Sequence, residues 1–138
     1  MSGNSRGYQT QWAAQFAVAS ELCKRGYEVS FTLGHTTPVA DLIAITPDKR
    51  TIFYVDVKGL WRKNSWLVKR KQKRNGLFYI LAYVPNDEPN QFFILNQATV
   101  HAHIERELKR LKRPKNYSVT GLPWKLAAAH TDWKILPQ

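Results

Sequence analysis

The chain has 138 residues, 43% of them hydrophobic, which is enough for one domain with its own core. Its 21 Lys and Arg residues against 10 Asp and Glu residues give a net charge of +11, which favours a polyanionic partner such as nucleic acid. Cys23 is the one cysteine, so the composition excludes an intrachain disulfide and a multi-cysteine zinc site.

The first predicted element is an amphipathic helix over residues 8–25, which Gly26 would end. Cys23 is expected to pack inside as a small hydrophobic residue. Apolar side chains at helical spacing form the stripe that is expected to face the core, namely Trp12, Phe16, Ala19 and Cys23, widened by Val18 and Leu22.

Several predicted strands follow this helix. Residues 27–33 alternate between polar and apolar side chains and predict a strand. Residues 40–46 and 51–59 flank a short Pro-Asp turn and predict a hairpin. Residues 77–84 are too apolar for an exposed strand and indicate a central one, and another strand is predicted over 91–95.

A second helix is predicted from Asn96, a potential N-cap, to about Lys112. Its buried side should be formed by Val100, Ile104, Leu108 and Leu111. The tail from Tyr117 gives no firm prediction. The order of helix, strands and helix predicts one α/β domain over residues 1–138, with a mixed sheet flanked by helices.

The hairpin brings two acidic residues together. A turn centred between Asp48 and Lys49 places Ile45 opposite Ile52, and the same register places Asp41 opposite Asp56. Two carboxylates in such a pair repel each other unless a positive group lies between them. A divalent cation with oxygen ligands would remove this repulsion.

A lysine is predicted beside these acids. Because side chains alternate along a strand, Tyr54, Asp56 and Lys58 share one face, and the apolar face that carries Val57 points into the core. A metal ion next to a lysine suits phosphate hydrolysis. The alternative is a surface ion pair between Asp41 and Lys58.

The first helix also presents an amide toward the interior. Gln15 lies on or beside the inward stripe of that helix, and a buried amide needs hydrogen-bond partners. The metal site would provide such partners. The alternative is that Gln15 is a core amide whose partners lie elsewhere.

These residues resemble the PD-(D/E)XK nuclease superfamily, which includes restriction enzymes, Holliday-junction resolvases and intron-encoded endonucleases. The resemblance rests on three runs of sequence, QFAVASELCKRGYEVSF, PVADLIAI and FYVDVKG. It implies a restriction-endonuclease-like core over about residues 8–95, followed by a C-terminal helix and tail over 96–138. The family's acidic strand position falls on Asp41, and its signature triplet falls on Asp56-Val57-Lys58.

The same resemblance implies the chemistry of the site. Asp41, Asp56 and the main-chain carbonyl of Val57 would hold Mg²⁺ or Mn²⁺, and Lys58 would position the attacking water. Ala40 replaces the proline of the family name. Gln15 stands where many relatives carry glutamate, which lowers the charge of the ligand set.

A basic segment follows the hairpin directly. Its cations can contact phosphates, and its tryptophans could stack on exposed bases. The candidate nucleic-acid-binding residues are Trp61, Arg62, Lys63, Trp66, Lys69, Arg70, Lys71, Lys73 and Arg74. A second basic cluster ends the late helix, where cations also suit the helix dipole, and comprises Lys109, Arg110, Lys112, Arg113 and Lys115.

The function predicted from these features is a metal-dependent DNA endonuclease. Two alternatives stay open, a non-catalytic DNA-binding module on the same fold and a basic RNA-binding protein without an active site. A cutter of both strands of this size would need two active sites, so a homodimer is also open. We expect an intracellular protein without a membrane partner, because the sequence lacks both a signal-peptide pattern and an apolar run near the ~20 residues of a membrane span.

Overall fold

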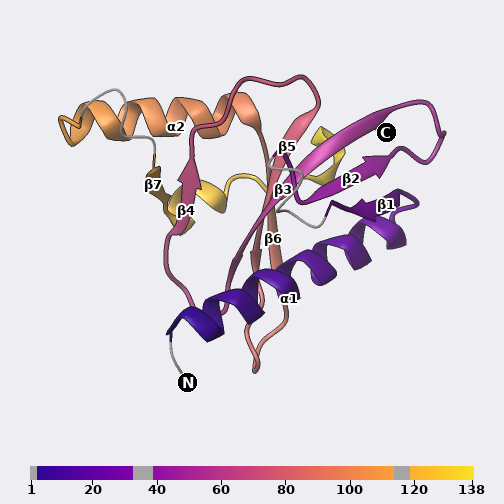
Figure 1. Cartoon of the computed structure of the whole chain (residues 1–138), viewed down its shortest axis with the longest axis horizontal. Helices are drawn as coiled ribbons and strands as arrows, with labels where there is room; N and C mark the ends of the chain where they lie inside the picture. The colour runs from indigo at the N-terminus through magenta and orange to yellow at the C-terminus, as the bar shows by residue number, and fades with distance from the viewer. Residues whose placement is uncertain (1–2, 33–38, 114–118) are drawn as a thin grey trace.

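A five-stranded mixed sheet forms the centre of the molecule, and a two-stranded sheet lies beside it (Figure 1). The computed structural model describes residues 3–32, 39–113 and 119–138, with side chains from residue 7 onward. Its elements are α1 (Gly3–Lys24), β1 (Glu28–Phe31), β2 (Leu42–Ile45), β3 (Ile52–Leu60), β4 (Trp66–Lys69), β5 (Leu77–Tyr83), β6 (Gln91–Asn96), α2 (Gln97–Arg110), β7 (Val119–Leu122), α3 (Trp124–Ala127) and the 3₁₀ helix η1 (Trp133–Ile135).

The strand order of the main sheet is β1-β2-β3-β5-β6, and that of the small sheet is β4-β7. The pair β3 and β5 is parallel, whereas all other described pairs are antiparallel. The apolar strand β5 lies between β3 and β6, as its composition predicted. The α/β class with a mixed sheet and flanking helices is therefore confirmed.

The β2–β3 hairpin has the predicted register. Ile45 pairs with Ile52 and Ile43 pairs with Tyr54. Asp48 stabilises the turn. Its Oδ1 accepts hydrogen bonds from the Thr46 hydroxyl at 2.6 Å and from the main-chain N–H of Arg50 at 3.0 Å. These local bonds fix the bend that aligns the two strands.

Each face of the main sheet carries its own hydrophobic core. On one face, α1 packs against the inward side chains of β3, which are Phe53, Val55 and Val57. On the other face, α2 and the small sheet cover Tyr79 and Leu81 of β5. Figure 1 shows α1 and α2 on opposite sides of the sheet. The molecule therefore has two cores, whereas the composition had suggested one.

The inward face of α1 differs from the predicted stripe. Phe16 is 60% exposed, and Cys23 is also exposed, so both were wrongly assigned to the core. Ala14, Val18 and Leu22 are the fully buried positions of this helix. The closest approach is at β3, where a Cβ on Gly59 would meet the Cβ of Ala14 at 2.6 Å, so only a small side chain fits on the helix at residue 14.

The second helix begins and ends close to the predicted residues. Asn96 caps it, since its Oδ1 accepts a hydrogen bond from Thr99 N at 2.8 Å. Val100, Ile104 and Leu108 are buried as predicted, but Leu111 is 44% exposed because the helix ends before it.

The small sheet was not predicted, because β4 lies within the basic segment and β7 lies within the tail that gave no firm prediction. No helix in the described ranges has the length and hydropathy needed to cross a membrane.

Candidate active site

Asp41 and Asp56 come together at the end of the hairpin ladder, which ends at the pair of Leu42 and Val55. The main-chain N–H of Asp41 donates to Val55 O at 3.0 Å. Its Oδ2 accepts a hydrogen bond from Val57 N at 2.7 Å. Burial raises the pKa of Asp41, the Val57 hydrogen bond opposes that rise, and the charge of Asp56 adds to it. Asp56 is therefore close enough to Asp41 to affect the ionisation of the Asp41 carboxyl.

The carboxylate of Asp56 is buried, with 1% of its surface exposed. Apart from two lysine ammonium groups, its oxygens have no polar partner among the described residues. These ammonium groups neutralise it, with Lys58 Nζ at 3.2 Å from Oδ1 and Lys71 Nζ at 2.5 Å from Oδ2. The ion pair of Lys58 is with Asp56, whereas the sequence had offered Asp41 as its alternative partner.

The environment of Asp56 has a low dielectric constant. Asp56 pairs in register with Tyr79 of β5, whose ring is fully buried. Burial, followed by the negative charge of Asp56, raises the pKa of the Tyr79 hydroxyl. The face of β3 that carries Asp56 is therefore covered by the second core, and it is not an open surface.

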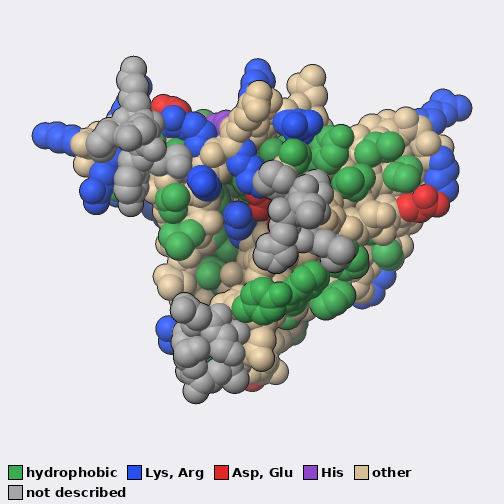
Figure 2. Space-filling model, in the orientation of Figure 1, with side chains coloured by type: hydrophobic (Ala, Val, Ile, Leu, Met, Phe, Trp, Pro, Cys, Tyr) green, Lys and Arg blue, Asp and Glu red, His purple; other side chains and the backbone are tan. Residues whose placement is uncertain are grey.

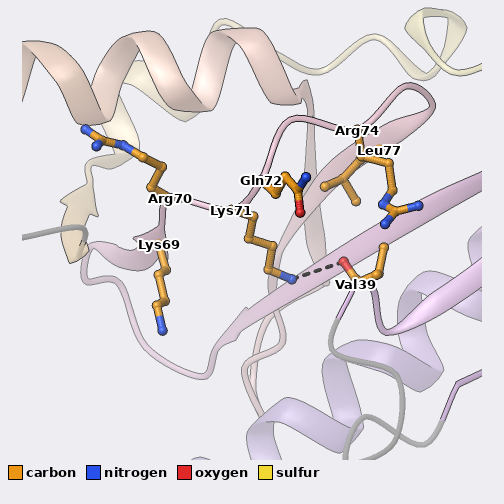
Figure 3. Close-up of a pocket in the computed structure, with 7 residues that line it drawn as sticks. All are labelled: Val39, Lys69, Arg70, Lys71, Gln72, Arg74 and Leu77. Atoms are coloured by element: carbon orange, nitrogen blue, oxygen red, sulfur yellow. Dashed lines mark hydrogen bonds between the residues drawn. The ribbon is translucent and has the colours of Figure 1, made fainter. Parts of the chain in front are cut away.

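Lys71 reaches this site from the irregular segment between β4 and β5. Besides its ion pair with Asp56, its ammonium donates to Val39 O at 3.2 Å, as Figure 3 shows. Lys71 was predicted to contact nucleic acid as one cation of a basic run. Sequence patterns carried no signal for its contact with Asp56, since the two residues lie on different elements.

Helix α2 holds the main chain of the segment that carries Lys71. Gln97 accepts from Arg74 N at 2.8 Å and donates to Gln72 O at 3.1 Å. The ring of His101 accepts from Lys71 N at 3.4 Å. Burial lowers the pKa of His101, so its imidazole is neutral near pH 7 and can accept this bond.

Gln11 of α1 forms a hydrogen bond to the site, although it was not among the predicted site residues. Its Nε2 donates to Val57 O at 2.7 Å, and this carbonyl is the predicted main-chain ligand. Gln15 lies one helical turn further along α1 and is half-buried. The spacing of four residues could have indicated both amides, since it places them on the same side of the helix.

Trp66 was wrongly assigned to base stacking. Its side chain is 1% exposed within the second core, and its indole N–H donates to Ala82 O at 3.2 Å. Trp61 is 37% exposed, and the guanidinium of Arg62 lies 5.0 Å from the centre of its ring. Of the two tryptophans, Trp61 is thus the one that a base could reach.

Most of the other predicted basic side chains lie at the surface. Figure 2 shows Lys and Arg side chains gathered on the side of the molecule that holds α2 and β4. Arg70 is half-buried and forms an ion pair with Glu105 of α2. The exposed members are Arg62, Lys63, Lys69, Lys73 and Arg74. In the second cluster, Lys109, Arg110, Lys112 and Arg113 are exposed, and Lys115 lies outside the described residues.

A basic pocket adjoins the buried carboxylate. It has a volume of about 300 Å³ and is lined by Val39, Lys69, Arg70, Lys71, Gln72, Arg74 and Leu77. In Figure 3, Lys71 extends toward Val39, while Arg70 extends the other way, toward α2. Lys71 thus belongs both to this pocket and to the ion-pair cluster around Asp56.

A second pocket, of about 400 Å³, lies on the side of Lys58. It is lined by Gln11, Lys58, Gly59, Leu60, Asn64, Ser65, Trp66 and Leu67. The ammonium of Lys58 therefore contacts the Asp56 carboxylate, and solvent can reach the Lys58 side chain through this pocket.

The donor set suits a hard divalent cation. Within the described residues, no group of three or more His, Cys, Asp or Glu side chains could hold a metal. The oxygens at the site belong to the carboxylates of Asp41 and Asp56 and to the carbonyls of Val39 and Val57, and Asp41 and both carbonyls already accept a hydrogen bond. Mg²⁺ is commonly held by one or two carboxylates and keeps several waters, so Asp41 and Asp56 are the residues that could hold it.

Searches of protein-family models, curated proteins and solved structures found no significant match to this chain. The class that the structure defines is an α/β protein with a mixed sheet, a buried acid with a half-buried acid beside it, and two lysines that converge on the buried one.

Proposed function

We propose that this protein is a metal-dependent DNA endonuclease with a restriction-endonuclease-like core. The observation that carries the proposal is the group of Asp41, which directly precedes β2, with Asp56 and Lys58 of β3, whose Nζ lies 3.2 Å from Asp56 Oδ1. The order of the elements supports the same fold, because α1 packs on a mixed sheet in which the acids lie at the start of β2 and within β3.

Asp41 and Asp56 would hold the metal, with the carbonyl of Val57 as a further ligand. Bound Mg²⁺ or Mn²⁺ would supply Lewis-acid stabilisation of a phosphate and lower the pKa of a coordinated water. Lys58 would position the attacking water. Gln11 would keep the Val57 carbonyl in place through its 2.7 Å hydrogen bond.

The basic surface supports a nucleic-acid substrate. Lys69 and Arg74 line the pocket next to the carboxylates, and Arg62 and Lys63 follow directly after β3. Such cations bind the phosphate backbone without reading sequence. They would keep a phosphodiester group close to Lys58 and Asp56.

A second candidate is a non-catalytic DNA-binding module on the same fold. Lys58 and Lys71 already bring two positive charges to the two acids, so the cluster is neutral without a metal. A cluster of this kind can serve the fold alone. The RNA-binding alternative has no specific observation in its favour.

A cleavage assay separates these candidates. Purified protein is incubated with supercoiled plasmid, linear duplex, branched DNA and RNA, each with Mg²⁺, with Mn²⁺ or with EDTA. The endonuclease should cut DNA in the presence of metal only. Asp56→Asn and Lys58→Met should abolish cutting while binding persists, whereas the exposed-residue controls Asp87→Asn and Lys134→Met should cut normally.

Binding without cutting under every metal would favour the module. A preference for RNA would favour the third alternative. Cutting by the Asp56→Asn protein would place the activity elsewhere or in a contaminant, and would overturn the assignment of the site.

A further inference from the structure

The ammonium of Lys71 lies between two oxygens of the candidate site. It contacts Asp56 Oδ2 at 2.5 Å and the carbonyl of Val39 at 3.2 Å. An ion coordinated by these oxygens and the Lys71 ammonium cannot both be present at this point, because they are like charges in a buried site.

The two lysines differ in how they are held. Lys58 is in a central strand, where it pairs with Leu81 in the β3–β5 ladder. Lys71 follows β4 in an irregular segment, and its main chain is tied to α2 by His101. The side chain of Lys71 is 26% exposed, while that of Asp56 is 1% exposed. The side chain of Lys58 is 29% exposed, so exposure does not separate the two lysines, and the difference between them is that Lys71 lies outside the sheet.

A destination for the displaced ammonium lies beside it. The basic pocket that Lys71 lines also carries Lys69 and Arg74, and would collect phosphates of a bound nucleic acid. A phosphate there would offer the ammonium a new anionic partner. Without that phosphate, leaving Asp56 would cost Lys71 its charge partner in the site.

We propose that Lys71 is a resident competitor of the metal. In the free protein its ammonium holds the cation position at Asp56 and Val39, and a divalent ion enters by displacing it toward the basic pocket. Metal binding and polyanion binding then strengthen each other, as linkage requires. This inference rests on the proposed function, since it assumes that a divalent cation binds at Asp41 and Asp56.

The test measures metal affinity directly. Mn²⁺ is titrated into the full-length protein, and the free ion is followed by electron paramagnetic resonance. Lys71→Met and Lys71→Gln should bind Mn²⁺ at least about tenfold more tightly than the wild type, a change of one decade in Kd. Lys69→Met removes one charge from the same segment without touching Asp56, and it should change the affinity much less.

Adding Asp56→Asn to Lys71→Met should remove the gain in affinity. Equal Kd values for Lys71→Met and the wild type would overturn the inference, and so would an equal gain in Lys69→Met. The cleavage assay keeps this failure apart from failure of the proposed function. If the wild type cuts DNA with Mg²⁺ but the Lys71 variants bind Mn²⁺ no more tightly, the proposed function stands and the proposed competition by Lys71 is wrong.

A measurement on the wild type covers the case in which both Lys71 variants fail to fold, as judged by circular dichroism. Lysines are acetylated briefly with acetic anhydride, with and without saturating Mn²⁺, and quantified by mass spectrometry. Displacement should raise the acetylation of Lys71 several-fold and leave that of Lys134 unchanged. Acetylation of Lys71 that does not respond to saturating Mn²⁺ would overturn the inference.

Discussion

The ammonium of Lys71 lies 2.5 Å from Oδ2 of Asp56, and a strand and an irregular segment separate the two residues along the chain. Lys58 binds the other oxygen at 3.2 Å. The buried carboxylate of Asp56 has no other polar partner among the described residues, so its burial depends on these two positive charges. The stability of the fold is therefore coupled to the residues of the candidate active site.

The double variant Lys58→Met with Lys71→Met should lower the free energy of unfolding by about 3–5 kcal/mol, because it leaves a buried charge without compensation. Each single variant should lose less, since the other lysine still neutralises Asp56. The two losses should therefore not add, with a coupling of about 1 kcal/mol or more. Urea denaturation of the three variants and the wild type measures this coupling.

Adding Asp56→Asn to the double variant is the control, and it should restore much of the lost stability. Strictly additive losses, or no restoration by Asp56→Asn, would show that the lysines stabilise the fold in some other way, for example through their aliphatic stems.

A second prediction concerns Asp41 and pH. Burial raises the pKa of this carboxyl above its ordinary value of 3.8. In the interval between the two values the folded protein binds more protons than the unfolded chain, so the free energy of unfolding falls as pH rises through it. Asp41→Asn removes this loss and can still accept the Val57 hydrogen bond. The variant should be more stable than the wild type at neutral pH and similar to it at low pH.

Asp48 provides a control of opposite sign. The Thr46 hydroxyl and then the Arg50 N–H lower the pKa of this exposed carboxyl below 3.8. Its charge therefore stabilises the fold above that pH, and Asp48→Asn should lose stability at neutral pH. Urea unfolding at low and neutral pH tests both variants. Neutral-pH stability that falls in Asp41→Asn would contradict the raised pKa.

The fit between α1 and β3 leads to a third prediction. A Cβ on Gly59 would lie 2.6 Å from the Cβ of Ala14 and 3.1 Å from the carbonyl of Thr10. Gly59→Ala should therefore push α1 away from the sheet and cost about 1–3 kcal/mol. It should also weaken the contact of Gln11 with Val57, which lies next to the candidate metal position.

Ala14→Gly in the same chain should recover part of this loss, since it removes the nearest atom. Gly7→Ala is the matched control, because a Cβ there meets nothing within 4 Å and the change should slightly stabilise the helix. Thermal unfolding of the four proteins gives the comparison. A Gly59→Ala protein as stable as the wild type would mean that α1 can shift freely.

The hairpin was predictable because its determinants are local. The turn at Asp48 and the alternation around Ile52 fix the register as far as Leu42 and Val55, so Asp41 and Asp56 lie next to the last pair although they do not pair in the ladder. Long-range features were not predictable in this way. The inward face of α1 depends on how closely it approaches Gly59, and that distance is set by packing between elements.

Strand β4 and the role of Lys71 also depend on tertiary contacts, which the sequence pattern of the basic segment does not indicate. Trp66 and Val68 alternate with exposed residues in β4, but four residues within a run of charge are too short a pattern to separate a strand from a loop. No sequence pattern distinguished Lys71 from the other lysines and arginines of this segment. Its role at Asp56 arises because β4 pairs with β7, and α2 then holds the segment that follows.

The surface cations and the two tryptophans give the last prediction. Lys69→Ala and Arg74→Ala should each weaken DNA binding across all sequences and reduce the slope of log K against log salt by about 1, as expected for single phosphate contacts. Trp61→Ala should weaken binding to single-stranded DNA if bases stack on its 37% exposed ring. Trp66→Ala should instead destabilise the fold by about 3–5 kcal/mol, because it leaves a cavity in the second core.

Fluorescence anisotropy over a salt series, paired with thermal unfolding of every variant, separates these effects. Lys134→Ala is the control for a general loss of positive charge, since this lysine lies in η1, and neither its affinity nor its salt slope should change much. Equal losses for Lys134 and Lys69 would mean that net charge alone attracts the DNA. Unequal losses, largest at the pocket beside Asp56, would place the phosphate backbone next to the carboxylates, where hydrolysis requires it.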